Sequence, residues 1–117
     1  MRRDELLLAE MIEAAEQAIA LTAGTTTEDI QADRQRRDAL LWNVTVLGEA
    51  ASQVSEQTRA AFPEVEWRQP ARLRNRIVHG YWSIDLDILH TTAVERLPAF
   101  LDALRHVLAA LEESDDE

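Results

Sequence analysis

The sequence of 117 residues contains no cysteine, which excludes disulfide bonds and cysteine-ligated zinc and fits a reducing compartment. Its three glycines are isolated from one another, so the chain has no glycine-rich phosphate-binding loop. No apolar run approaches the roughly 18–20 residues of a membrane span. Acidic residues enter the amino-terminal segment at Asp4 and Glu5, unlike a secretory signal. These absences predict a cytoplasmic protein.

Lysine is also missing, so all twelve basic residues are arginine, against 22 acidic residues and a formal net charge of -10. Such a chain lacks the broad basic face that nonspecific nucleic-acid binding normally uses. The charge is uneven, however. Residues 112–117 form an acidic tail that we predict to be disordered. The stretch 67–82 holds no acid and four arginines, namely Arg68, Arg72, Arg74 and Arg76.

Helix-forming residues dominate, apolar positions recur with the 3.6-residue period, and the alternation typical of strands is absent. We expect a short turn near residues 27–29 and helices over about 3–21, 33–58, 70–79 and 85–113. Pro70 would start the third helix, Gly80 would end it, Asp85 would cap the fourth, and Pro98 would kink it. The predicted fold class is all-α, an antiparallel up-down bundle of four to five helices forming one domain over residues 1–111.

The second predicted helix has an unusually wide apolar surface. A second stripe beside its core-facing stripe contains Trp42, Val46, Glu49 and Gln53. Helices that pack on two sides show such a surface, and one side could belong to another subunit. Glu49 would need a partner if it were buried there. It could equally form a structural ion pair or lie at the surface.

The segment 72–81 combines residue types that suit phosphodiester chemistry. On a helix, Asn75 and His79 share one face with Arg72 nearby, and the long side chain of Arg74 could reach inward. Histidine can exchange a proton near neutral pH, and arginine binds phosphate and stabilises developing negative charge. Such a set can cleave RNA without a metal, by attack of the ribose 2′-OH on the adjacent phosphate. The products would carry a 2′,3′-cyclic phosphate and a 5′-hydroxyl.

Transesterification needs a base and an acid, whereas each chain offers one histidine in this segment. A two-fold dimer would supply both by bringing two copies together. The residue types alone leave another interpretation open, in which His79 is a helix cap or a surface group and the arginines form a solvated face. His90 and His106 are sixteen residues apart and lack metal-ligand spacing, so no metal or cofactor is expected. Asp85 and Asp87 fit a cap and a surface charge.

The sequence contains an Arg-x4-His-x-Tyr motif, formed by Arg74, His79 and Tyr81. Asn75 directly follows the motif arginine. This motif resembles that of HEPN-domain toxins of the HepT kind. The surroundings are also similar over about residues 33–111: residues 47–51, Trp67, residues 84–85, and residues 97–98 fall where that family has similar residues.

The resemblance implies a HEPN-like four- or five-helix bundle that forms homodimers, with both motifs in a cleft at the interface. It implies metal-independent RNA cleavage that halts growth, with transfer RNA among the candidate substrates. The usual partner is a minimal nucleotidyltransferase antitoxin, which in some systems transfers AMP to the motif tyrosine. By this resemblance Arg74 and His79 would be catalytic, Asn75 would support them, and Tyr81 would accept AMP or simply pack the loop. Arg72 and Arg76 would help to bind RNA.

Two other hypotheses remain. The chain could be a non-catalytic helical dimer that binds a nucleotidyltransferase partner or a nucleotide, in which case partner binding would survive loss of His79. It could also be a purely structural adaptor, which would leave the arginine-rich segment unexplained.

Overall fold

The computed structural model describes the backbone of residues 2–80 and 85–115 and the side chains of residues 2–77 and 85–114. Helix follows helix along these residues, and no strand occurs in them. The elements are α1 (Arg2–Thr22), α2 (Thr27–Ala32), α3 (Arg34–Gln53), α4 (Glu56–Ala61), α5 (Arg68–Gly80), α6 (Leu86–Thr91), the π-helical turn η2 (Thr92–Arg96) and α7 (Leu97–Asp115).

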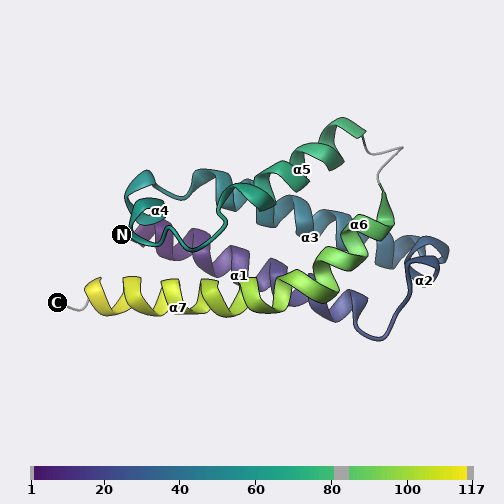
Figure 1. Ribbon diagram of the computed structural model, residues 1–117, viewed down its shortest axis with the longest axis horizontal. Helices are drawn as coiled ribbons and strands as arrows, with labels where there is room; N and C mark the ends of the chain where they lie inside the picture. Colours follow the sequence, from purple (N-terminus) through teal and green to yellow (C-terminus); the bar gives the residue numbers. More distant parts are fainter. Residues whose placement is uncertain (1, 81–84, 116–117) are drawn as a thin grey trace.

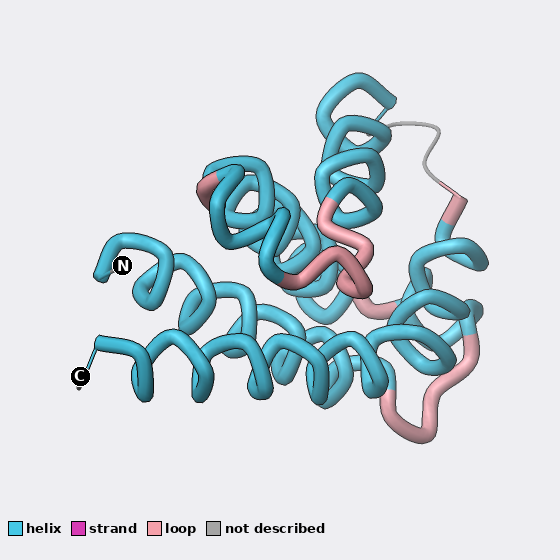
Figure 2. Tube along the Cα trace, turned by 60° about the vertical axis from the view of Figure 1, so that its left-hand side comes forward, coloured by secondary structure: helices cyan, strands magenta, loops and turns pink. Residues whose placement is uncertain are grey.

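The long helices run up and down along a body of 50 × 28 × 21 Å, with both chain ends at one end of the body (Figure 1). α1 packs between α3 and α7, and α5 covers the other side of α3. Figure 2 shows α1 and α7 side by side, with α5 standing away from them across α3. The predicted all-α, HEPN-like bundle is therefore confirmed.

A single hydrophobic core joins these helices. The stripe predicted from the sequence lies on α3 and on Val54 directly after it, and every member is buried, namely Leu40, Val44, Leu47, Ala51 and Val54. α1 adds Leu8 and Met11, α5 adds Ile77 and α7 adds Leu104. Burial of these apolar side chains is the main force that holds the helices together. Trp42, in the second stripe of α3, is instead 67% exposed.

The prediction of one helix over residues 33–58 was wrong, because the chain breaks after α3. Val54 has an extended backbone, and Ser55 caps α4 by accepting a hydrogen bond from the Thr58 N–H. The break places Ser55 and Thr58 against Asp4 at the start of α1. The buried Asp4 carboxylate accepts hydrogen bonds from the Ser55 N–H (3.1 Å), the Ser55 hydroxyl (2.5 Å) and the Thr58 hydroxyl (2.6 Å). A buried carboxylate with three donors fixes the end of the bundle.

Burial alone would raise the pKa of Asp4, since the charged form loses its water. The hydrogen bonds from Ser55 and Thr58 outweigh this effect and hold the pKa of Asp4 below its ordinary value of 3.8. Asp4 is therefore ionised in the folded protein at neutral pH.

The caps of the remaining helices follow local sequence signals. Thr26 and Asp29 form a reciprocal capping box that starts α2, in the segment predicted as a short turn. Asp33 caps α3, and Asp85 caps α6 as predicted. α5 begins at Arg68, two residues before the predicted start, and Pro70 lies in its first turn, where a missing N–H does no harm.

Pro98 does not produce the simple kink that the sequence predicts in the last helix. Proline cannot donate a helical hydrogen bond and its ring crowds the preceding turn. The chain responds with the wide turn η2, in which the Leu97 N–H reaches back five residues to the Thr92 carbonyl. The helical backbone of α7 then extends to Asp115, so it includes part of the predicted tail. The division into residues 1–111 and 112–117 stays a prediction.

Candidate functional site

The arginine-rich segment folds as α5, which approaches α3 unusually closely at Gly48. A Cβ atom added to Gly48 would lie less than 3.0 Å from the Arg74 Cβ atom and from the Pro70 carbonyl oxygen. Real Cβ atoms essentially never make such contacts, so only glycine fits at this crossing. The absence of a side chain at Gly48 thus sets the position of the first half of α5, and with it that of Arg74.

The Arg74 side chain points toward α3, which is the inward direction that the sequence allowed for it. Its Nη1 lies 3.2 Å from the Glu49 carboxylate, and only 24% of its side chain is exposed. The Arg74 Nε is buried and has no hydrogen-bond partner among the described residues. Glu49 is 53% exposed, so it forms a surface ion pair and not a buried one. The pair holds one edge of the Arg74 guanidinium, and a planar guanidinium has further donors for a phosphate.

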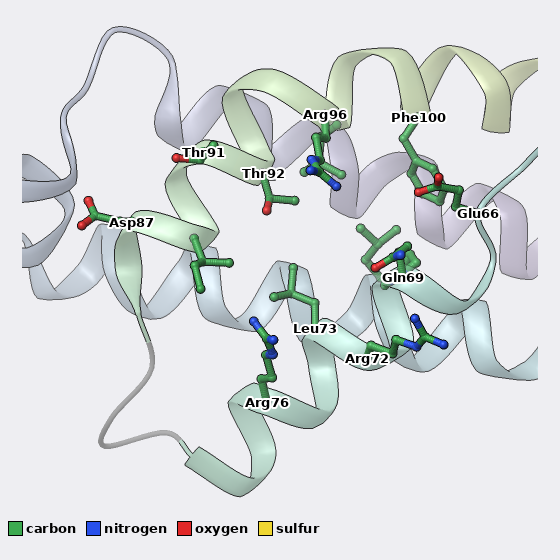
Figure 3. A pocket seen from close by; sticks show the side chains of 14 residues that line it. Glu66, Gln69, Arg72, Leu73, Arg76, Asp87, Thr91, Thr92, Arg96 and Phe100 are labelled. Carbon is green, nitrogen blue, oxygen red and sulfur yellow. The ribbon is translucent and has the colours of Figure 1, made fainter.

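The other predicted site residues of α5 lie on different faces. Asn75 is exposed. Arg72 and Arg76 line a cavity of about 790 Å³ between α5 and the α6–η2–α7 segment (Figure 3). Leu73 is half-buried and also lines this cavity. The structure therefore separates Arg74, against α3, from Arg72 and Arg76, which face the last helices.

His79 lies in the last turn of α5, so its backbone is helical. Its side chain, and Tyr81 as a whole, fall outside the described residues. The predicted roles of His79 and Tyr81 therefore stay predictions.

Sequence reasoning missed Arg96. It is the last residue of η2 and lines the same cavity as Arg72 and Arg76, twenty residues further along the chain than Arg76. An isolated arginine in an amphipathic helix carries no signal of its own. The nearest hint is Pro98, two residues later, which marks the place where the regular helix must change.

The remaining histidines have other surroundings. The His90 Nε2 lies 2.7 Å from the Thr25 carbonyl oxygen and ties α6 to the loop before α2, while His106 is exposed. Among residues 2–77 and 85–114 no group of three histidine, aspartate or glutamate side chains could hold a metal ion. In the same part of the chain no helix is long and apolar enough to cross a membrane.

Comparison with known proteins gives consistent matches. "Probable ribonuclease HepT" of Thermococcus cleftensis is 28% identical over 92 residues, covering 79% of this chain and 84% of the relative. "Putative RNase MJ0127" of Methanocaldococcus jannaschii is 24% identical over 109 residues, covering 93% and 90%. No significant match to a solved structure was found. A family model described as ribonuclease HepT-like matches residues 11–107. The chain therefore belongs to the ribonuclease HepT-like family.

Proposed function

We propose that this protein is the toxin of a toxin–antitoxin pair and that it cleaves RNA without a metal. The ribonuclease names of its relatives support the substrate class. The observation that carries the proposal is the placement of Arg74, the first residue of the Arg-x4-His-x-Tyr motif. Its guanidinium is half-buried and anchored on one edge by Glu49. An oriented guanidinium can stabilise the extra negative charge of a phosphorane because little reorganisation is needed.

The proposed reaction is a transesterification within the RNA. The ribose 2′-OH attacks the adjacent phosphorus, the bond to the 5′-oxygen of the next nucleotide breaks, and that oxygen takes up a proton. We assign the proton transfers to His79, whose side chain type can give and take a proton near neutral pH. Arg74 would stabilise the phosphorane, Asn75 would support them, and Arg72 and Arg76 would help to bind the RNA.

We further propose that the active form is a homodimer, in which two copies of His79 provide the base and the acid. The exposed face of α3 supports this proposal. A groove of about 620 Å³ runs between α1 and α3, and Leu7, Trp42 and Val46 line it together with Glu49. Trp42 is 67% exposed, and exposed aromatic side chains are typical anchors of protein interfaces. Because Glu49 contacts Arg74, this face adjoins the motif.

The proposed regulator is a minimal nucleotidyltransferase antitoxin that transfers AMP to Tyr81. Mass spectrometry of the chain co-expressed with such an enzyme and ATP tests this part. A gain of one AMP that is absent in Tyr81→Phe supports it, and an unmodified wild-type chain contradicts it.

The cleavage mechanism is tested by incubating the purified protein with a defined single-stranded RNA and with transfer RNA in excess EDTA. The expected products carry a 2′,3′-cyclic phosphate and a 5′-hydroxyl. Replacing the single 2′-OH at the cut site by hydrogen should abolish cleavage there, because the nucleophile is lost. Cleavage of the 2′-deoxy substrate at an unchanged rate would contradict transesterification.

A further inference from the structure

The cavity between α5 and the last helices is lined by positive charges that form no ion pair with a described residue. Arg72 and Arg76 enter it from α5, and Arg96 enters it from η2. None of the three forms an ion pair with a described residue, whereas five arginines elsewhere do so, namely Arg34, Arg36, Arg37, Arg74 and Arg105. What distinguishes these three exposed arginines is that they line one cavity together, and cations without carboxylate partners among the described residues suit an anionic ligand.

The arrangement of the cavity identifies the charge of that ligand. Figure 3 shows Arg76 reaching into the space from α5 and Arg96 entering from the opposite side, where Thr92 also lies. Like charges gathered in one cavity repel one another, and an anion bound among them turns that repulsion into attraction. Asp87 and Glu66 lie toward the two ends of the cavity (Figure 3), which leaves the middle cationic. Arginine pairs bind phosphate oxygens especially well, since each guanidinium can donate two parallel hydrogen bonds.

The apolar side chains that line the cavity indicate which other groups the ligand carries. Leu73, Ile88 and Phe100 line the same cavity, so apolar surface lies directly beside the arginines. Ile88 remains 41% exposed. A phosphate joined to a flat, largely apolar ring matches this combination, and nucleobases pack on such side chains without regard to sequence. The volume of about 790 Å³ falls within the range of roughly 300–1,000 Å³ that is usual for small-molecule sites.

The proposed ribonuclease function identifies this ligand as a strand of RNA. Arg72 and Arg76 belong to the motif helix α5, although they face the last helices while Arg74 faces α3. The wide turn η2 brings Arg96 to the wall opposite α5. A strand of RNA that passes around α5 from the motif would enter this cavity, and three arginines suit its repeated phosphates.

We propose that this cavity binds single-stranded RNA, with its phosphates at Arg72, Arg76 and Arg96 and one unpaired base against Phe100. Arg96 is then a binding residue supplied by η2. The inference rests on the proposed function in that RNA is taken as the substrate.

The test uses binding, which does not depend on cleavage. The probe is a fluorescent twelve-nucleotide RNA with 2′-O-methyl groups throughout, which lacks the nucleophile, and its binding to the full chain is followed by anisotropy. Arg96→Gln removes one charge inside the cavity. Arg105→Gln is the matched control, because Arg105 lies further along the same helical segment and pairs with Glu16 and Asp102 outside the cavity. Thermal unfolding confirms that both variants fold.

We expect Arg96→Gln to weaken binding about tenfold and to lower the slope of log Kd against log salt by about 0.7, the loss of one phosphate contact to a single strand. Arg105→Gln should change Kd less than about twofold. Equal weakening in both variants would overturn the inference, since Arg96 would then act only through net charge. If Arg96→Gln weakens the binding of fluorescent AMP but leaves the binding of the RNA probe unchanged, the inference is overturned and the cavity is a nucleotide site.

The binding assay also separates this inference from the proposed function. If wild type cleaves RNA in EDTA while Arg96→Gln binds the probe as wild type does, the cavity assignment fails and the ribonuclease proposal stands. If wild type binds the probe through Arg96 but leaves natural RNA intact, the cavity assignment stands and the cleavage proposal fails.

Discussion

Gly48 offers a sharp test of how α5 is positioned, because two effects of one substitution oppose each other. Replacing glycine by alanine inside a helix normally stabilises a protein by about 0.5–1 kcal/mol. At Gly48 the added Cβ would meet the Arg74 Cβ and the Pro70 carbonyl oxygen at less than 3.0 Å. Neither atom is the end of a flexible side chain, so α3 and α5 must move apart.

Such overpacking costs about 1–3 kcal/mol, and the rigidity of both contacts favours the upper end. We therefore expect Gly48→Ala to lower the free energy of unfolding by about 2 kcal/mol after the helix-propensity gain is subtracted. RNA cleavage should fall as well, since Arg74 moves with α5. Urea denaturation followed by circular dichroism measures the stability through the linear dependence on denaturant.

Gly24 provides the matched control for this substitution. Its φ is +70°, and nothing lies within 4 Å of an added Cβ. Gly24→Ala should therefore cost about 1–2 kcal/mol through backbone strain alone, with cleavage unchanged. A Gly48→Ala protein that is as stable as wild type and fully active would refute the close packing of α3 and α5.

Three further substitutions test separate features of the molecule. Asp4→Asn should lower the free energy of unfolding by about 2 kcal/mol at pH 7, because the charged acceptor of three hydrogen bonds is lost. The folded-state pKa of Asp4 is lowered, so this contribution is present above about pH 4 and is lost as the pH falls through the folded pKa. A difference between wild type and variant that does not shrink as the pH is lowered from about 7 into the acid range would contradict it. Trp42→Glu should raise the dimer dissociation constant at least about 30-fold with little change in monomer stability. Light scattering at several protein concentrations measures the dissociation constant, and an unaffected dimer would exclude this face of α3 as the dimer interface. Glu49→Gln should change stability by less than about 1 kcal/mol, yet slow cleavage about threefold to tenfold by releasing Arg74; unchanged cleavage would show that the ion pair has no positioning role.

The sequence predicted the elements whose signal is local and periodic. The buried stripe of α3 and the cap at Asp85 follow from the spacing of apolar residues and from short-range hydrogen bonding, and both are present. The break after Gln53 was missed because it depends on Asp4, about fifty residues away in the chain. Helix propensity depends on nearby residues and cannot indicate a hydrogen-bond partner so far away in the sequence.

The same limit applies to the candidate site. The motif arginine could be found from its spacing to His79 and Tyr81. An ion pair of Glu49 was one of the options that the sequence left open, but the sequence did not identify Arg74 as its partner. Arg96 could not be found, because its neighbours in the cavity come from α5 and its own place depends on the wide turn before Pro98. Tertiary contacts, and not local pattern, decide which arginines share a surface.

The central claim is that the motif in α5 catalyses RNA cleavage, and the rate of cleavage of a labelled single-stranded RNA in excess EDTA tests it most directly. Arg74→Ala and His79→Ala are compared with wild type, and His106→Ala, which alters an exposed histidine of α7, is the control. Circular dichroism confirms the fold of each protein, and mass spectrometry confirms that Tyr81 is unmodified. We predict that wild type and His106→Ala cleave at similar rates, while both motif variants lose at least about 100-fold, as expected for loss of a general acid–base group or of an oriented charge. Cleavage by His79→Ala and Arg74→Ala at the wild-type rate would contradict the claim.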